Sequence, residues 1–458
     1  MRTRIPAKKE SAVLLPPHAR THTHMPLLHP SLPPHRLLVV RQCRLIAPPV
    51  HPPSRLSVRA AAAAPVAHEV CALPFPPDRA SHHRELAAAV ASVERACRLC
   101  VDVRASMLVG DEKILEKNDQ THVTIADFGV QALISFELQQ LFPSIPLVAE
   151  EDSAFIRSSN TADSKSNTLV ESISSFFTKH VNNNGPPLTH DDVLRAIDRG
   201  GKDAVSFDSN PATYWLLDPI DGTKGFLKGE DSLYVVGLAL VVDGKLAVGV
   251  MGCPNLTETT VGDTEDESIA ACPGHGILMV SHVGCGTWSR PMSAEIGQLT
   301  TAPDVWKRCS VDPCSVAQMA RFCIVDSHTW DMMPLSAHFS STMDESEPRD
   351  ENKILLQNSC GGSLSKYLLV ACGRMSVFIL LARAEKLLKA WDHAVGVICV
   401  EEAGGQTCDW SGKPLDFGAD LTGHRIIYPS GGVLATNGAL HDKLVEMVSA
   451  NYKNSNVE

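Results

Sequence analysis

The sequence predicts an α/β protein with two folded domains, and three observations support this prediction. The first is its size and composition: 458 residues, 44% apolar and 20% charged, are enough for two or three domains with large cores. The second is Asp243-Gly244, a two-residue hairpin signal between apolar segments. The third is the alternation of strand-like and helix-like segments in the second half. We therefore expect an α+β domain over 65–270 and an α/β domain over 271–458.

Residues 1–64 differ in composition from the rest of the chain. Residues 1–68 contain ten Arg or Lys residues and one acid, Glu10, so they carry +9 and the remainder carries −20 of the net charge of −11. An Arg-rich, acid-poor leader is typical of an organellar transit peptide. We expect residues 1–64 to be a disordered transit peptide, mitochondrial by its Arg content, with the chloroplast as the alternative. A disordered cytosolic tail or a misassigned start codon would explain the same composition.

The acidic body of the chain restricts its partners. A nucleic-acid duplex requires a basic surface, so we expect no nucleic-acid partner. No segment reaches the roughly 18 apolar residues of a membrane span, so we expect no membrane partner, and we expect a monomer. A small anionic substrate is compatible with this charge if metal ions are bound. The scattered cysteines indicate buried thiols, although Cys97 and Cys100 also have the spacing of a redox or zinc pair.

The first domain begins with a long helix, because apolar residues recur at helical spacing from Arg84 to about Leu115. A second helix, capped by Thr124 or Asp127, is predicted to run to Phe142. The polar segment 153–191 indicates a variable surface excursion. The remaining elements expected here are a strand over Ile145–Ala149, helices near Leu169–Phe177 and over Asp191–Gly200, a strand ending near Leu217, and strands over Tyr234–Val242 and Lys245–Met251.

The second half of the chain alternates between the two patterns. Apolar runs of strand length are separated by stretches with helical periodicity, which predicts an α/β domain. The expected strands are Ile277–His282, Thr287–Ser289, Phe322–Val325, Val377–Leu381 and Leu434–Thr436, and the expected helices lie near Cys360–Leu369, Ala390–Ala403 and His441–Val448.

The segment Trp215–Gly229 has the clearest chemical character. A buried strand ends near Leu217, and the carboxylates of Asp218 and Asp221 follow it, with a proline between them and a Gly-Thr turn after them. Converging oxygens of this kind are what a hard divalent cation requires. Asp-Pro and Asp-Gly pairs are also common in ordinary strand-exit turns. The segment alone leaves both interpretations open.

Other acids have two interpretations as well. Glu150, Glu151 and Asp152 follow a predicted strand and are either a solvated strand end or metal ligands. Asp392 lies in the first turn of a predicted helix, where an acid is ordinarily a cap. Asp119 lies in an irregular loop, which suits either a solvent-exposed turn or an active site.

Taken together, these segments resemble the lithium-sensitive, magnesium-dependent phosphomonoesterase superfamily, which includes inositol monophosphatases and 3'(2'),5'-bisphosphate nucleotidases. The acidic pair at Glu150, the segment Asp218–Thr223 and the segment Trp391–Gly396 occur in the expected order. Lys117–Asp127 and Lys224–Gly229 resemble the nucleotidase branch, because inositol phosphatases usually carry Asn where this chain has Gly225. The resemblance covers about residues 85–450 and is strongest to plant nucleotidases of organellar type.

The resemblance implies a layered α-β-α-β-α fold with the active site in a cleft between the domains. It also implies two or three Mg²⁺ ions, a water activated by Asp119 and Thr223, and a phosphate bound near Gly222 and Thr223. Glu151 is a candidate for a supporting role. The implied metal ligands are the carboxylates of Glu150, Asp218, Asp221 and Asp392 and the backbone carbonyl of Ile220.

For the nucleotide, the resemblance implies contacts from the second domain. His328 follows a strand, although a surface or core histidine would look the same. An arginine of the family aligns with Leu380, and Arg383 lies three residues further on, so the contact to the 5'-phosphate stays open. The implied substrate-binding residues are Gly222, Thr223, His328, Ser363, Lys366, Tyr367, Arg383 and Asp392.

The implied function is hydrolysis of the 3'-phosphate of 3'-phosphoadenosine 5'-phosphate (PAP) to AMP and phosphate, with the sulfated form (PAPS) as a further substrate. Such an enzyme belongs to sulfur metabolism, and the family resemblance implies inhibition by lithium. The alternatives are an inositol phosphate or polyphosphate phosphatase on the same scaffold and a non-catalytic nucleotide sensor.

Overall fold

The structure is a computed structural model. The predicted transit peptide, residues 1–64, and Asp119 lie outside the residues that it describes. The described residues are 73–109, 115–116, 122–159, 165–181, 185–202, 207, 212–228, 232–256, 276–292, 306–342, 351–358, 361–383 and 387–455.

The first sheet has seven strands among the described residues, in the order β3-β4-β5-β6-β7-β8-β9. β3 and β4 are parallel, and every later pair is antiparallel. The predicted hairpin is confirmed, with positive φ at Asp243 (49°) and Gly244 (76°) between β5 and β6. The strands are β3 (Leu147–Ala149), β4 (Tyr214–Asp221), β5 (Val235–Val242), β6 (Lys245–Cys253), β7 (Ile277–His282), β8 (Gly286–Pro291) and β9 (Lys307–Arg308).

The second sheet has six strands in the described part of the chain, in the order β11-β12-β10-β13-β17-β15. β10 to β13 are parallel to one another, whereas β17 runs antiparallel to β13 and β15. The chain therefore leaves the first sheet at Arg308, the end of β9, and enters the second sheet at Arg321, the start of β10. The domain boundary expected after residue 270 stays a prediction. The strands are β10 (Arg321–Ile324), β11 (Ser340–Thr342), β12 (Lys353–Asn358), β13 (Val377–Leu381), β15 (Gln406–Asp409) and β17 (Gly432–Thr436).

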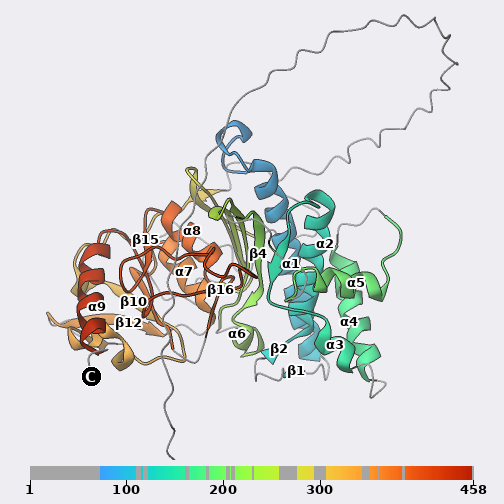
Figure 1. Ribbon diagram of the computed structural model, residues 1–458. Coiled ribbons are helices and arrows are strands. Elements are labelled where there is room, and N and C mark those ends of the chain that lie inside the picture. The colour runs from blue at the N-terminus through green and yellow to red at the C-terminus, as the bar shows by residue number, and fades with distance from the viewer. Residues whose placement is uncertain are drawn as a thin grey trace, which may run out of the picture. The chain divides into compact units, whose positions relative to one another are not determined.

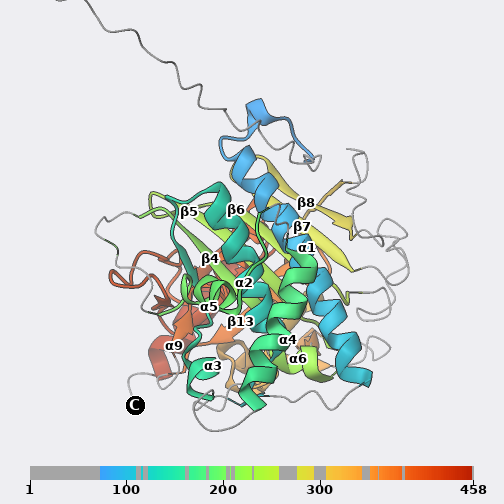
Figure 2. The same ribbon diagram turned by 90° about the vertical axis from the view of Figure 1, so that its right-hand side faces the viewer.

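Helices and sheets alternate in five layers, which confirms the predicted α-β-α-β-α arrangement (Figure 1). α1 and α2 pack on the outer face of the first sheet, and α4 and α5 pack against these two helices, as Figure 2 shows from that side. α7 and α8 contact both sheets, and α9 packs beyond the second sheet. The helices of these layers are α1 (His83–Val109), α2 (Ile125–Leu141), α4 (Lys165–His180), α5 (His190–Asp198), α7 (Ser363–Ala371), α8 (Ala394–Glu402) and α9 (His441–Ser455).

Short elements complete the described chain. None of the described helices is both long and apolar enough to cross a bilayer. The short elements are β1 (Leu115–Glu116), β2 (His122–Val123), α3 (Ala154–Ser159), α6 (Thr223–Lys228), β14 (Leu388–Lys389) and β16 (Ile426–Ile427), with 3₁₀ turns at Pro77–Arg79, Ala317–Met319, Trp330–Met332 and Pro334–Ala337.

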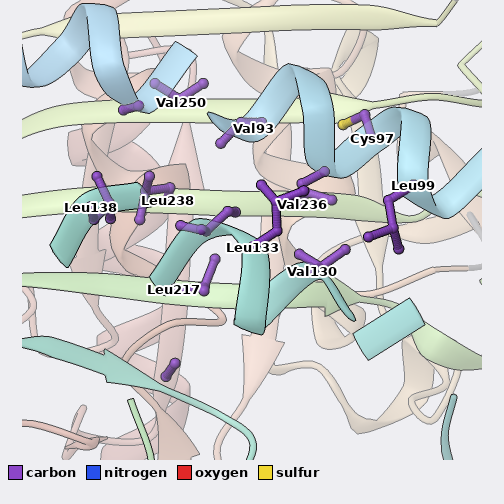
Figure 3. Close-up of a cluster of buried hydrophobic side chains, with 14 of the residues drawn as sticks. Val93, Cys97, Leu99, Val130, Leu133, Leu138, Leu217, Val236, Leu238 and Val250 are labelled. Atoms are coloured by element: carbon purple, nitrogen blue, oxygen red, sulfur yellow. The ribbon is translucent and has the colours of Figure 1, made fainter. Parts of the chain in front are cut away.

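The core of the first domain lies between α1, α2 and the first sheet (Figure 3). Val93 of α1, Leu133 of α2 and Leu238 of β5 are fully buried there. α4 belongs to the predicted excursion 153–191, yet it buries Ile173 and Phe177 in this core. Burial of apolar side chains at about 25 cal/mol per Å² is the main stabilising term, so this part of the excursion is a structural element.

Two local predictions have clear outcomes. Thr124 caps α2, and Asp127 completes a capping box with it, so both candidate caps take part. The prediction that Asp392 lies inside the first turn of its helix is wrong. α8 begins at Ala394, and Asp392 lies in the preceding turn, where His393 is the N-cap residue.

Candidate active site

A pocket of about 610 Å³ opens where strands of both sheets end. Its walls include the end of β4, the segment Val325–His328 after β10, and Leu380 and Leu381 at the end of β13. Ligands of open α/β sheets bind outside the carboxyl ends of the strands. The pocket contains most of the predicted site: Glu150, Asp218, Ile220, Asp221, Gly222, Thr223, His328, Ser363, Arg383 and Asp392 all line it.

The parallel pairing of β3 and β4 places two of the acids side by side. Ala149 pairs with Leu217, so Glu150 and Asp218 are the next residues along the two strands. The pairing of β4 with β5 is irregular between Asp218 and Asp221, where Pro219 has no N–H for the ladder. This irregularity lets both aspartates of β4 face the pocket.

Asp218 is a buried acid whose charge is unfavourable in its surroundings. Its side chain is 2% exposed, and its Oδ1 atom has no hydrogen-bond partner. Burial raises its pKa well above the ordinary value, and the negative charges of Glu150, Asp221 and Asp392 raise it further. A bound cation would relieve this repulsion. The oxygen-only donor set fits a hard cation such as Mg²⁺.

Asp221 has a second set of partners. Its Oδ1 accepts a hydrogen bond from the backbone N–H of Ser363 (3.1 Å), and its Oδ2 accepts one from Leu364 (2.6 Å). These are the first N–H groups of α7, so Asp221 caps that helix from the first sheet. Burial raises the pKa of Asp221, and the charge of Lys366 and the α7 N–H groups oppose the shift.

Two glycines make this contact sterically feasible. A Cβ atom on Gly362 would lie 1.8 Å from Oδ1 of Asp221. A Cβ atom on Gly222 would lie 2.6 Å from the backbone nitrogen of Gly362, and Gly222 also has a φ of +88°.

Within the described residues, no group of three or more His, Cys, Asp or Glu side chains is already arranged to hold a metal ion. The acids therefore interact electrostatically across the pocket while Asp221 is turned toward α7.

The hydroxyl of Thr223 lies at the start of α6. Its Oγ1 is 3.3 Å from Oδ1 of Asp127 and 3.2 Å from the carbonyl oxygen of Ile220. Oδ2 of Asp127 accepts hydrogen bonds from the N–H and hydroxyl of Thr124. The sequence pattern identified Asp127 only as a helix cap. Its second role beside Thr223 depends on tertiary packing between α2 and β4.

The residues of the predicted motif Ser363–Tyr367 lie in different surroundings. Ser363 lines the pocket, but Lys366 and Tyr367 do not. Nζ of Lys366 donates to the carbonyl of Gly361 (2.7 Å), and the hydroxyl of Tyr367 is 2.9 Å from Nδ1 of His393. Lys366 and Tyr367 are both fully buried, and their direct contact with a substrate stays a prediction.

Among the other lining residues, the guanidinium of Arg383 donates to the carbonyl of Ser327 (2.6 Å), next to His328. Leu380 is 6% exposed and lines the pocket beside them. Lys224 and Lys228 of α6 also line the pocket, although the sequence pattern did not single them out as ligands.

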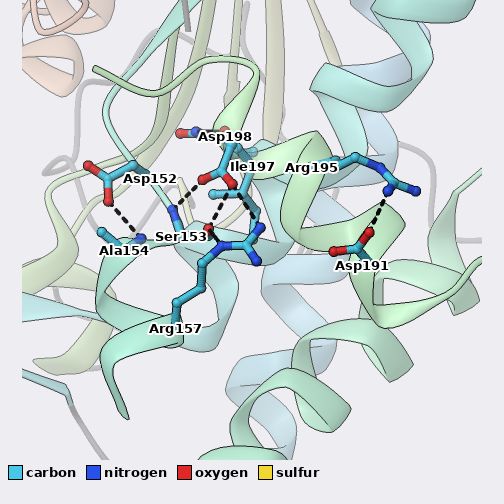
Figure 4. Close-up of polar contacts among 9 residues, drawn as sticks. Asp152, Ser153, Ala154, Arg157, Asp191, Arg195, Ile197 and Asp198 are labelled. Carbon is cyan, nitrogen blue, oxygen red and sulfur yellow. Dashed lines mark hydrogen bonds and ion pairs between the residues drawn. The ribbon is translucent and has the colours of Figure 1, made fainter. Parts of the chain in front are cut away.

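The remaining two acids of the triplet are not among the residues that line the pocket. Glu151 is 3% exposed, and its backbone N–H donates to the side chain of Gln131 (2.8 Å). Asp152 accepts a hydrogen bond from the N–H of Ala154 at the start of α3 (Figure 4). Of the three, only Glu150 lines the pocket.

A model of the inositol monophosphatase family matches residues 82–452. An Arabidopsis thaliana protein with the provisional name mitochondrial 3'(2'),5'-bisphosphate nucleotidase is 53% identical over 378 residues, covering 82% of this chain and 90% of that protein. The chain belongs to the inositol monophosphatase family. This membership confirms the resemblance predicted from the three acidic motifs.

Other family members are more distant. The 3',5'-bisphosphate nucleotidase AHL of A. thaliana is 30% identical, covering 81% of this chain and 98% of that protein. A 3'(2'),5'-bisphosphate nucleotidase of Oryza sativa is 31% identical, covering 81% and 95%. Among solved structures, an inositol monophosphatase from Anabaena has 17% identity and a TM-score of 0.46, covering 81% of this chain and 97% of that one.

Proposed function

We propose that this protein is a Mg²⁺-dependent phosphomonoesterase that removes the 3'-phosphate of PAP, giving AMP and phosphate. The observation that carries the proposal is Asp218, a buried carboxylate with an unpartnered oxygen, repelled by Glu150, Asp221 and Asp392 beside an open pocket. Burying an unpaired carboxylate costs folding free energy. Carboxylates perturbed in this way cluster at functional sites. The names of the relatives support a bisphosphorylated nucleotide as the substrate.

The metal site consists of the carboxylates of Glu150, Asp218, Asp221 and Asp392 and the carbonyl of Ile220. Bound there, Mg²⁺ would lower the pKa of a coordinated water and neutralise charge on the transferring phosphoryl group. Because Asp221 also caps α7, its side chain couples this site to the helix that begins with Ser363.

The chain's own groups orient the water and the substrate. The Thr223 hydroxyl donates its hydrogen to Oδ1 of Asp127 or to the carbonyl of Ile220, which leaves an Oγ1 lone pair to accept a hydrogen from the attacking water. Asp119 is proposed as the base that takes the proton of that water. The proposal for Asp119 rests on the family resemblance.

The lining residues from the second half of the chain suit a nucleoside. Leu380, Leu387 and the ring of His328 provide apolar and planar surface for a base, and Arg383 and Lys228 provide positive charge for a second phosphate. Arg383 thus takes the role for which the family arginine at the position of Leu380 is missing. PAPS is a further substrate of this site, and lithium inhibits it.

The setting of the enzyme is also proposed. Residues 1–64 are a transit peptide that directs the protein to the mitochondrion, which the name of the Arabidopsis relative supports. The enzyme acts as a monomer in sulfur metabolism, where it removes the bisphosphorylated nucleotide.

The test is a phosphate-release panel with the full-length protein. PAP, PAPS and inositol phosphates are compared at equal concentration with Mg²⁺ and with EDTA. We expect Mg²⁺-dependent release that is fastest from PAP, and almost complete loss of release in Asp221→Asn. Faster turnover of inositol phosphates would reverse the substrate assignment. Tight PAP binding without release would favour the non-catalytic sensor, and full activity of Asp221→Asn would refute the metal assignment.

A further inference from the structure

Arg425 lies outside the pocket lining, but its backbone is fixed to the segment that carries Asp392. It directly precedes β16, which pairs antiparallel with β14 through Lys389 and Ile426. The carbonyl of Arg425 accepts a hydrogen bond from the N–H of Ala390 (2.8 Å), two residues before Asp392. The backbone N–H of Arg425 donates to Oδ2 of Asp420 (3.0 Å), which holds the preceding loop in place.

The side chain of Arg425 reaches the end of β3 in the first sheet. Its Nη2 donates to the carbonyl of Ala149 (2.7 Å) and more distantly to that of Glu150 (3.5 Å). Its Nη1 donates to the carbonyl of Gly200 (3.2 Å). The residues joined by these bonds are 225 to 276 positions apart in the sequence.

The same guanidinium also lies over Trp391. Its Cζ atom is 4.7 Å from the centre of the ring, and Trp391 is 3% exposed. One planar group therefore contacts the end of β3, which carries Glu150, and the residue that directly precedes Asp392. Arginine suits this position because it has several donors in a fixed plane and an apolar face for stacking.

We propose that Arg425 is a positioning residue that holds Glu150 and Asp392 at the correct separation and thereby sets the affinity of the site for Mg²⁺. The proposal rests on the metal assignment of the proposed function. Arg425 acts through the backbone of β3 and through Trp391, without touching the substrate. Residues that orient metal ligands in this way typically change metal affinity about 10–100-fold when they are replaced.

The experiment measures metal binding directly. Mg²⁺ is titrated by calorimetry, without substrate, into full-length wild type, Arg425→Met and Arg425→Lys, and thermal unfolding is recorded in EDTA. Arg321→Met is the matched control, because Arg321 also donates to a backbone carbonyl, that of Gly373 (3.1 Å), at the end of β10 opposite the pocket. Phosphate release is measured in parallel as a function of Mg²⁺ concentration.

We expect Arg425→Met to bind Mg²⁺ about 10–100-fold more weakly, with a matching rise in the Mg²⁺ needed for half-maximal release. Arg425→Lys keeps the charge but not the planar set of donors, so it should also bind more weakly. Arg321→Met should bind Mg²⁺ like the wild type, even if it unfolds at a lower temperature.

Three results would overturn the proposal. Unchanged Mg²⁺ affinity in both Arg425 variants would remove the positioning role alone, while Mg²⁺-dependent release by the wild type kept the proposed function. An equal loss in Arg321→Met would show that general destabilisation explains the effect. A wild type that binds no Mg²⁺ would overturn the proposed function and the positioning role together. If Arg425→Met does not fold, Arg425→Lys decides between weaker and unchanged binding.

Discussion

Replacing Asp218 by asparagine should make the metal-free protein more stable while it abolishes the activity. Asp218 is 2% exposed, its Oδ1 has no partner, and the other acids of the pocket repel its charge. Like charges about 4 Å apart repel by about 1 kcal/mol in water and about 4 kcal/mol near a protein surface. Asparagine has nearly the same shape and keeps a polar group at this site, but it carries no charge for the other acids to repel. We therefore expect Asp218→Asn to raise the free energy of unfolding in EDTA by about 1–3 kcal/mol.

Mg²⁺ should make the wild type more stable than Asp218→Asn. A ligand at about 1,000 times its dissociation constant stabilises the folded state by about 4.1 kcal/mol, which exceeds the gain expected from the substitution, and this stabilisation should be present in the wild type and nearly absent in Asp218→Asn. Thermal unfolding of both proteins in EDTA and in excess Mg²⁺ measures the effect. At about 2–4 °C per kcal/mol for a domain of about 150–250 residues, the shifts are readily resolved. The variant should melt above the wild type in EDTA and below it in Mg²⁺.

The matched control is Asp409→Asn. Asp409 is 6% exposed, but its carboxylate accepts hydrogen bonds from the N–H groups of Ser411, Lys413 and Ser430. Its replacement should destabilise the protein by about 1–3 kcal/mol in both buffers. If Asp218→Asn melts below the wild type in EDTA, as this control should, then Asp218 is not electrostatically strained and the reasoning is wrong.

Three other predictions test separate contacts. Gly362→Ala places a Cβ atom 1.8 Å from Oδ1 of Asp221, so urea unfolding should show a loss of about 2–5 kcal/mol, and a loss below about 1 kcal/mol would contradict the contact. Thr223→Val removes the hydroxyl and should lower kcat by about 100-fold or more, with little change in the free energy of unfolding in EDTA. Thr223→Ser keeps the hydroxyl and should have a kcat near that of the wild type. A wild-type kcat in Thr223→Val would reject the role of this hydroxyl in orienting water. His282 accepts the N–H of His82 at Nε2, and burial lowers its pKa, so unfolding free energy should fall as pH drops below about 6.5. His282→Gln should remove this part of the pH dependence, measured by urea unfolding at several pH values. An unchanged dependence of the unfolding free energy on pH would show that His282 is not its source.

The sequence was sufficient for the elements whose signals are local. The hairpin at Asp243 and the helix capped by Thr124 follow from turn chemistry and capping, which involve residues only a few positions apart. Glu150 follows the expected strand β3, whereas the strand expected to end near Leu217 continues as β4 to Asp221, so Asp218 lies within it. From the residues alone the metal-site interpretation of both acids stayed open, and the family resemblance decided it. The start of α8 was not predictable, because the turn containing Asp392 has no strong helix-breaking residue.

The motif Ser363–Tyr367 shows the limit of matching residues to roles. Ser363 and Lys366 are three residues apart on α7, yet Ser363 faces the pocket and Lys366 is buried against the carbonyl of Gly361. Which face of the helix meets the pocket depends on how α7 packs between the two sheets. Helical spacing alone does not determine that orientation.

The contacts that join the first sheet to α7 and to the segment before β16 could not be predicted for a more general reason. In each of them a side chain meets main-chain groups: Asp221 accepts from the N–H groups at the start of α7, and Arg425 donates to the carbonyls of Ala149 and Gly200. Every residue except proline offers both an N–H and a C=O group, so the partner segment carries no residue type that marks the contact. A search for complementary charges would find neither pair. The geometry of the acid cluster therefore depends on backbone positions set by the packing of whole layers, which only the folded chain specifies.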